Sequence, residues 1–215
     1  MHGFGRSGRT WQHSLPYLQA HQVIVLDLPG YGRSRFKGQW LLREITPLLA
    51  TWLRQMELSS VTLIGHSMGG GIAIHLAALA PELIERLILV NAVGIPLQID
   101  LLTLFHRAIL SSLQNVKKSS RVDFISDITL SNPRLLWHSL LELISIDLRP
   151  ELATITIPTL IIWGERDLLV PLPLGQALFR ALPHAYFVSL PNCAHRSHFT
   201  EPEKFSRLVV EFSNR

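Results

Sequence analysis

Short apolar segments alternate with amphipathic ones along most of the chain, and this alternation limits the possible folds more than any other feature. The apolar segments are rich in Val, Ile and Leu, often at successive positions rather than at every second one. That pattern is typical of parallel strands covered by helices on both faces. The sequence therefore predicts an α/β fold with a mostly parallel sheet. The five predicted strands are Gln22–Leu28, Val61–Gly65, Arg86–Asn91, Thr159–Gly164 and Ala185–Leu190.

Helical patterns lie between these strands, with apolar residues spaced for one face of a helix. One stretch, residues 94–150, breaks the alternation because it has helical patterns at Leu101–Leu113 and Leu135–Ile144 but no convincing strand. We expect Val116–Ser120 to be its exposed turn. The predicted organisation is a core of residues 1–93 and 151–215 with a helical insertion at 94–150. The core helices are predicted at Trp11–Gln19, Leu41–Met56, Met68–Leu79, Leu172–Leu182 and Pro202–Phe212.

Composition excludes several classes of protein. With 47% hydrophobic and 17% charged residues, the 215-residue chain is suited to one ordinary globular domain rather than to disorder. No apolar run reaches the ~18 residues of a membrane span, and the first residues lack the apolar region of a signal peptide. The single cysteine, Cys193, can form neither an internal disulfide nor a cysteine zinc site. We therefore expect a cytoplasmic protein.

The net charge of +4 is only weakly concentrated. The excess of positive charge lies in an arginine-rich N-terminal segment. We interpret these arginines as part of a solvated surface rather than as an anion site. We expect no nucleic-acid partner, since such a face needs clustered Lys and Arg.

The segment Gly65-His66-Ser67-Met68-Gly69-Gly70 follows a predicted strand at once and opens a predicted helix. This is the setting that a G-x-S-x-G nucleophile elbow requires. Glycines allow the sharp turn, and the turn presents the Ser67 hydroxyl at the positive end of the helix. The pattern alone is frequent, but its strand–turn–helix setting favours Ser67 as a nucleophile over a simple glycine turn.

With this elbow and four further motifs, the whole chain resembles the α/β-hydrolase family. His2-Gly3-Phe4-Gly5 is similar to the oxyanion loop of that family, and Asp27-Leu28-Pro29-Gly30-Tyr31-Gly32-Arg33-Ser34 to its D-x-P-G-x-G-x-S loop. Trp163-Gly164-Glu165-Arg166-Asp167 is similar to its acid-bearing turn and Asn192-Cys193-Ala194-His195 to its histidine loop. The resemblance implies an α/β-hydrolase fold with a small helical cap, which residues 94–150 would form.

The resemblance also implies a catalytic triad of Ser67, Asp167 and His195, in the family's order along the chain. A serine hydroxyl needs a base near pH 7, and His195 would take its proton while Asp167 holds the imidazole. Two rivals remain open: His198 for the base, although it suits a capping or supporting role better, and Glu165 for the acid. Cys193, near the base, is interpreted as a packed small residue.

Further roles follow from the same resemblance. The oxyanion hole would be formed by the backbone N–H groups of Phe4 and Met68, which meet the charge that develops on the substrate oxygen. We expect His66, beside the nucleophile, and Leu104 and Trp137 of the insertion to contact substrate. Apolar insertion residues suggest a hydrophobic acyl group, although they equally suit packing against the core. The implied chemistry uses no cofactor and no metal.

The sequence thus predicts a serine hydrolase that cleaves a carboxylic ester or related acyl bond of a small molecule through an acyl-enzyme. Two alternatives stay open: a truncated or non-catalytic scaffold with a binding role, and an acyltransferase or cofactor-free perhydrolase that uses the same site. A serine rather than an aspartate nucleophile argues against dehalogenase and epoxide hydrolase chemistry. The substrate and the oligomeric state are not predicted by the sequence.

One departure from the family concerns the first strands. The oxyanion loop normally follows a central buried strand, but here His2 is the second residue, so that strand and the two before it are missing. The segments Gln22–Leu28 and Val61–Gly65 must then either leave a slot between them or pair directly. We hypothesise that Met1 is an internal methionine and that about 20 to 40 further residues, including a strand of ~5 residues, precede it.

Overall fold

The computed structural model describes residues 1–114 and 126–215 and has a parallel four-stranded sheet at its centre. The strands lie in the order β1-β2-β3-β4, and each neighbouring pair is parallel. This confirms the predicted α/β class and four of the five predicted strands. Their bounds are Val61–His66 for β1, Ile84–Val90 for β2, Thr159–Gly164 for β3 and Ala185–Leu190 for β4.

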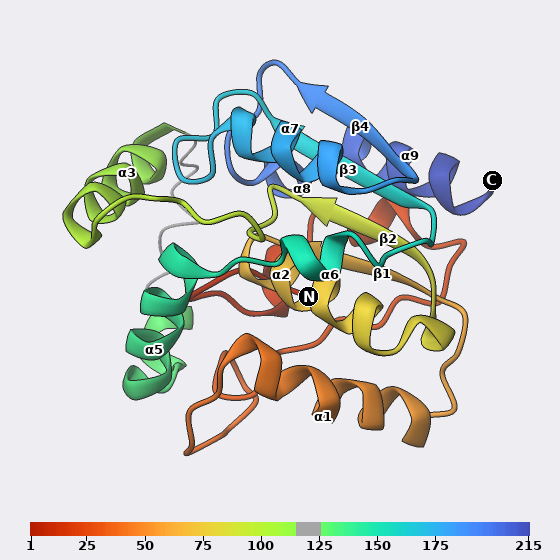
Figure 1. The fold of residues 1–215 in the computed structure, drawn as a ribbon, viewed down its shortest axis with the longest axis horizontal. Helices are drawn as coiled ribbons and strands as arrows, with labels where there is room; N and C mark the ends of the chain where they lie inside the picture. The colour runs from red at the N-terminus through yellow and green to blue at the C-terminus, as the bar shows by residue number, and fades with distance from the viewer. Residues whose placement is uncertain (115–125) are drawn as a thin grey trace.

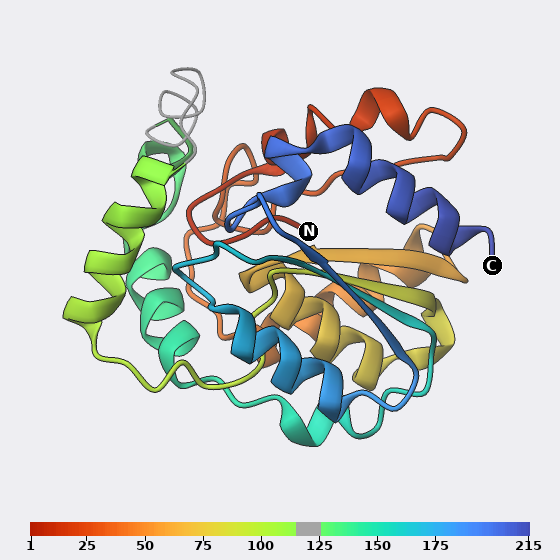
Figure 2. The same cartoon turned by 90° about the horizontal axis from the view of Figure 1, so that it is seen from above.

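Helices cover both faces of this sheet, as Figures 1 and 2 show. The helices α1 (Leu42–Gln55), α2 (Met68–Leu79) and α7 (Leu172–Ala181) lie on one face, and α9 (Pro202–Ser213) lies on the other. Side chains of β2 alternate between them: Leu87 and Leu89 join the core under α1, α2 and α7, whereas Ile88 and Val90 join the core under α9. Burial on both faces explains why the strand segments are apolar throughout.

Described residues of the 94–150 stretch form helices and no strand. The helices α3 (Leu101–Gln114) and α5 (Pro133–Ser145) lie at the same end of the molecule, beside the sheet, while α6 (Arg149–Leu152) lies near α2 (Figure 1). A short helical stretch covers residues 126–130. The predicted turn at Val116–Ser120 lies outside the described residues.

Hydrogen bonds join α5 and its N-cap residue to residues 30–42 of the core. The Tyr31 hydroxyl donates to Ser139 Oγ at 3.0 Å, and the Leu42 backbone N–H donates to the Glu142 carboxylate at 2.9 Å. At the start of α5, the Asn132 amide donates to the Gly38 carbonyl oxygen at 2.9 Å. These bonds hold α5 beside the loop that contains Tyr31.

The prediction of a helix at Trp11–Gln19 is wrong. Two short 3-10 turns stand there instead, η1 (Gly8–Trp11) and η2 (Leu15–Tyr17). Pro16 explains the break, because its ring nitrogen has no N–H to donate within a helix. Trp11 and Leu18 are nevertheless buried, and they pack in the core beneath α9.

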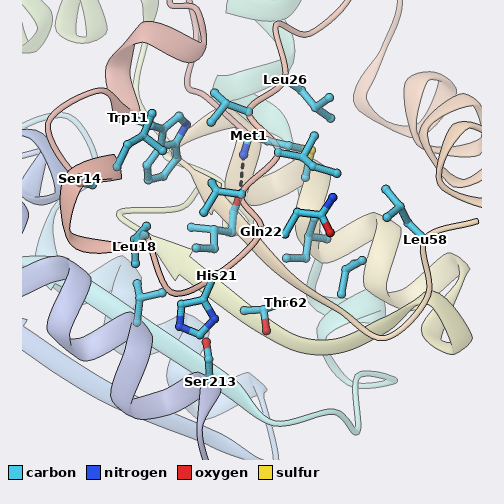
Figure 3. Close-up of a pocket in the computed structure, with 18 of the residues that line it drawn as sticks. Met1, Trp11, Ser14, Leu18, His21, Gln22, Leu26, Leu58, Thr62 and Ser213 are labelled. Atoms are coloured by element: carbon cyan, nitrogen blue, oxygen red, sulfur yellow. Dashed lines mark hydrogen bonds between the residues drawn. The ribbon is translucent and has the colours of Figure 1, made fainter. Parts of the chain in front are cut away.

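The prediction of a strand at Gln22–Leu28 is also wrong. Within residues 1–114 and 126–215, this segment pairs with no strand, and the side chains of Val23, Ile24 and Val25 are 42%, 46% and 37% exposed. Between it and β1 lies a groove of about 410 Å³, lined by residues 22–26 on one side and 58–64 on the other. Figure 3 shows this groove, with Gln22 and Leu26 facing Leu58 and Thr62 across it. A β-strand needs a neighbouring chain for its backbone hydrogen bonds, and this segment has none.

Met1 lies at one end of this groove and pairs with β1 (Figure 3). Its amino group donates to the Ile64 carbonyl oxygen at 2.5 Å, and its carbonyl oxygen accepts from the His66 backbone N–H at 3.1 Å. The two bonds bring the first residues of the chain against the end of β1. Burial lowers the pKa of the Met1 amine to about 5.

Candidate active site

Ser67 occupies a strained turn between β1 and α2. Its φ of 54° and ψ of −119° are unusual for a residue with a side chain, and such conformations persist only where surrounding bonds enforce them. Here the Ser67 backbone N–H donates to the Val90 carbonyl oxygen at 3.0 Å, and its carbonyl oxygen accepts from the Val93 N–H at 3.1 Å. The neighbouring strand end therefore holds the turn in place.

Close packing requires glycine at position 65 in this turn. A Cβ there would lie 2.3 Å from the Gly69 carbonyl oxygen, closer than any real side chain allows. The first turn of α2 therefore lies directly against the end of β1. This approach leaves Ser67 at the N-terminal end of α2, where the helix dipole stabilises negative charge.

Asp167 and His195 are brought together by the loops after β3 and β4. His195 Nδ1 lies 2.7 Å from Asp167 Oδ2, and both residues are buried. A carboxylate accepts hydrogen bonds, so Nδ1 carries the proton and Nε2 has a free lone pair. The other oxygen, Asp167 Oδ1, accepts from the backbone N–H groups of Leu169 at 2.8 Å and Val170 at 3.0 Å. His195 in this tautomer is suited to accept a proton at Nε2.

The two rival residues make other contacts. Glu165 accepts a hydrogen bond from Ser189 Oγ at 2.7 Å, on the exposed side of the loop. His198 is fully buried, with Nε2 3.0 Å from Thr10 Oγ1 and its ring 4.4 Å from that of Trp11. Burial, followed by the nearby Arg196 charge, holds the pKa of His198 well below its ordinary value. Of the two candidate acids, Asp167 and Glu165, only Asp167 accepts a hydrogen bond from the His195 imidazole.

Asn91 is a residue of this site that the sequence analysis missed. It follows β2, is fully buried, and donates from Nδ2 to Asp167 Oδ2 at 2.7 Å. The available signal was its position: it is a polar residue at the carboxyl end of a predicted buried strand, where α/β sheets place their functional side chains. That position in the sequence does not show which distant carboxylate the Asn91 side chain would contact.

The segment His2-Gly3-Phe4 lies against the elbow. A Cβ on Gly3 would be 3.1 Å from Ser67 Cβ and 3.0 Å from His66 Nδ1, so the loop passes very close to the nucleophile candidate. The buried His2 ring anchors this loop, because its Nε2 accepts from the Leu28 N–H at 3.0 Å. Burial lowers the pKa of His2 to about 4, so its ring is neutral at pH 7.

The backbone N–H groups of Phe4 and Met68 make no hydrogen bond to another group in the described parts of the chain. Met68 begins α2, so its N–H is one of the free donors at the helix N-terminus. Both donors belong to segments that adjoin Ser67. They are available to a substrate oxygen beside the serine.

The three residues predicted to contact substrate lie in different surroundings. His66 is buried beneath the site, and its Nε2 lies 2.8 Å from the His195 backbone oxygen. Leu104 of α3 is partly buried and packs against the main core. Trp137 of α5 is 54% exposed. The structure thus places His66 among the groups that hold His195, and the other two on the helical insertion.

Among residues 1–114 and 126–215, no group of three or more His, Cys, Asp or Glu side chains is arranged to hold a metal ion. The same residues include no helix long and apolar enough to cross a membrane.

Comparison with known proteins agrees with this fold. The family model described as "Alpha/beta hydrolase family" matches residues 1–208, and the chain belongs to this family. It is a hydrolase, as its named relatives are. A pimeloyl-[acyl-carrier protein] methyl ester esterase from Vibrio cholerae is 30% identical, with 100% of this chain and 93% of that protein covered.

A second relative and a solved structure extend this similarity. A putative carbamate hydrolase from Pseudomonas savastanoi is 29% identical over 99% of this chain and 91% of its own length. The crystal structure of a bromoperoxidase from Bacillus anthracis superposes with a TM-score of 0.88 at 25% identity, covering 100% of this chain and 94% of that one. The family's members thus share this fold while their names describe different reactions.

Proposed function

We propose that this protein hydrolyses carboxylic esters through an acyl-enzyme formed on Ser67. The observation that carries this proposal is the buried Asp167–His195 hydrogen bond of 2.7 Å, combined with the strained elbow that presents Ser67. A binding module has no need of an imidazole held in one tautomer. The ester hydrolases among its relatives support the same reaction class.

In the proposed reaction, Ser67 Oγ attacks the ester carbonyl carbon while His195 Nε2 takes the hydroxyl proton. The resulting oxyanion accepts hydrogen bonds from the Phe4 and Met68 N–H groups, each worth roughly 3 to 4 kcal/mol. His195 then gives its proton to the departing alcohol, which leaves an acyl group on Ser67. Water attacks this acyl group, again with His195 as the base, and release of the acid restores Ser67.

Asp167 stabilises the imidazolium that forms in each half of this cycle. Its two carboxylate oxygens accept hydrogen bonds from the N–H groups of Leu169 and Val170 and from the Asn91 amide. The neighbouring His66 is neutral because burial, followed by His198 and His195, holds its pKa well below the ordinary value. The proton therefore moves between Ser67, His195, the substrate and the attacking water, and not through His66.

We propose that residues 94–150 form a cap over this site and that the acyl group lies beneath it. Support comes from Tyr31, whose hydroxyl contacts both Ser139 of α5 at 3.0 Å and the Met68 sulfur at 3.7 Å. Tyr31 thus connects the insertion with a residue of the proposed oxyanion hole. Esters of small alcohols are the first substrates to test, since one relative is named a methyl ester esterase.

The test is fluorophosphonate labelling combined with hydrolysis of a p-nitrophenyl ester series of increasing acyl length. We expect Ser67→Ala to abolish labelling and to lower kcat by about 10⁴- to 10⁶-fold. Ser59→Ala, an exposed serine, is the matched control and should retain both. A folded wild-type protein that neither labels nor hydrolyses any ester would favour the binding alternative and overturn the proposal.

The similarity to a bromoperoxidase favours one second activity on the same site. Hydrogen peroxide would replace water in attacking the acyl-enzyme, which gives a peracid and free Ser67. To test this, hydrogen peroxide, or an alcohol for acyl transfer, is added to the ester assay. The rate of product formation with each acceptor is then compared with the rate of hydrolysis by water. Peracid formation that Ser67→Ala abolishes would show this activity.

A further inference from the structure

The amide of Asn91 is held between two fixed partners. On one side its Oδ1 lies 3.4 Å from the Gly164 backbone nitrogen, at the end of β3, and on the other its Nδ2 lies 2.7 Å from Asp167 Oδ2. A backbone N–H can only donate and a carboxylate can only accept, so the orientation of the amide is determined. Its N–H necessarily points at the acid.

The backbone of Asn91 is fixed as well. Its N–H donates to the Ile162 carbonyl oxygen at 3.0 Å, which continues the β2–β3 pairing by one residue. Its φ of 44° lies in the left-handed region, which asparagine tolerates better than most residues. The side chain is fully buried. Asn91 is thus a rigid donor that a different residue would not easily replace.

Asp167 Oδ2 receives two hydrogen bonds, one from Asn91 and one from His195, both of 2.7 Å. Because Oδ1 is already bonded to two backbone N–H groups, the carboxylate cannot rotate without losing bonds on both oxygens. The Asn91 donor therefore decides how Oδ2 faces the imidazole. It also removes part of the negative charge that Oδ2 presents to His195.

We infer that Asn91 is a positioning residue that orients Asp167 toward His195 and shares the negative charge that Asp167 Oδ2 presents to the imidazole. This inference rests on the proposed function for its role in turnover, but its effect on His195 can be measured without turnover. The observation behind the inference is that Asn91 and His195 both bond the same carboxylate oxygen, Asp167 Oδ2.

Other titratable or charged groups also surround His195. His66 at the end of β1 has its ring 4.8 Å from the His195 ring, His198 of α8 (Ser197–Thr200) is in contact with His66, and Arg196 is the next residue. Burial keeps both neighbouring imidazoles neutral, and Arg196 stays positive. Asp167 is therefore the negatively charged group beside His195 through which Asn91 acts.

Asn91→Gly tests the inference because it removes the donor and accepts the backbone conformation of position 91. Without the Asn91 N–H, Asp167 Oδ2 presents more of its negative charge to His195, so the His195 pKa should rise by roughly one unit. We expect kcat at pH 7 to fall by roughly 10- to 100-fold with KM nearly unchanged, and the acidic limb of the pH profile to move to higher pH. The His195 pKa is measured directly by NMR titration of the imidazole and assigned with His195→Gln.

Asn192→Gly is the matched control, because it makes the same change at an exposed asparagine only three residues before His195. The Asn192 amide contacts Arg166 rather than Asp167, so its loss should change the His195 pKa much less. Asn91→Ala, which also lacks the donor, serves if Asn91→Gly does not fold. It too should raise the His195 pKa and lower kcat.

An unchanged His195 pKa in folded Asn91→Gly, or in folded Asn91→Ala, would overturn the inference. So would an equal shift in Asn192→Gly, because the loss of any nearby amide would then explain the result. Absence of labelling and hydrolysis in the wild-type protein would instead refute the proposed function. The NMR titration would still decide whether Asn91 acts on His195 through Asp167.

Discussion

The His66 ring lies 2.8 Å, measured from Nε2, from the backbone carbonyl oxygen of His195. A carbonyl oxygen only accepts, so His66 Nε2 carries the proton and donates it. This bond ties the residue before the proposed nucleophile to the residue proposed as its base. The two segments are far apart in the chain, and the bond fixes their separation at the point where proton transfer would occur.

We predict that His66→Gln retains most activity whereas His66→Phe does not. The glutamine amide can donate from nearly the position of Nε2, but phenylalanine fills the space without a donor. Displacement of His195 should lower kcat by about 10- to 100-fold in His66→Phe. Steady-state kinetics on one ester, with exposed His106→Phe as control, measures the difference. Equal losses in the two His66 variants would contradict a role for the hydrogen bond.

Asp167→Asn should lower kcat by about 10⁴-fold while the protein remains folded. The asparagine cannot stabilise a positive imidazole, and it favours the wrong tautomer of His195. Glu165→Gln is the matched control, because Glu165 bonds Ser189 rather than His195. The kcat of this variant should stay within about twofold of wild type. If Glu165→Gln caused the larger loss, the assignment of Asp167 as the acid would be wrong.

The free energy of unfolding should decrease as the pH falls from 8 toward 4. In a chain that begins at Met1, the Met1 amine has a folded pKa of about 5 against 8.0, and His2 has a folded pKa of about 4 against 6.5, so the folded state disfavours both charged forms. For a lowered pKa, the stability present above the unfolded value is lost as the pH falls to the folded value. The loss per group is at most about 1.4 kcal/mol per pH unit. Urea unfolding at several pH values measures it.

N-terminal acetylation separates the two contributions. An acetylated Met1 has no amine to protonate, so the decrease between pH 8 and 6.5 should disappear while the later decrease from His2 and the other buried imidazoles remains. His21→Gln, an exposed histidine, should leave both parts unchanged. A pH dependence that acetylation does not alter would argue against a buried neutral amine in the folded state.

The groove beside β1 should promote self-association. Open strand edges with exposed apolar side chains are sites of edge-to-edge pairing, and Val23, Ile24 and Val25 lie along this groove. We predict that Ile24→Lys lowers aggregation, measured by light scattering during mild heating, with a stability change within about 0.5 kcal/mol.

Leu48→Lys is the matched control for this prediction. Leu48 is 60% exposed on α1. Because it lies on a helix rather than along an open strand edge, its substitution should change aggregation less. Equal suppression by the two variants would show that surface charge, rather than the groove, controls the association.

Local patterns predicted the sheet class, most helices and the elbow, because those features depend on residues close together in sequence. Apolar runs buried on both faces indicated β2 and β3, and the glycines of the elbow indicated a turn around Ser67. The same reasoning failed at Gln22–Leu28, since its apolar pattern suits a strand but strand formation also needs a partner chain. It also failed at Trp11–Gln19, because Pro16 has no backbone N–H to donate within a helix.

The sequence by itself determined which residue types stand at the ends of the strands: Ser67 after β1, Asn91 after β2, Asp167 after β3 and His195 after β4. The parallel sheet brings those ends to one edge, because every strand runs in the same direction. Only the tertiary structure decided which of them meet, at 2.7 Å between Asp167 and both Asn91 and His195. A hydrogen bond requires atoms to approach within about 3 Å, and that distance depends on packing of the whole chain.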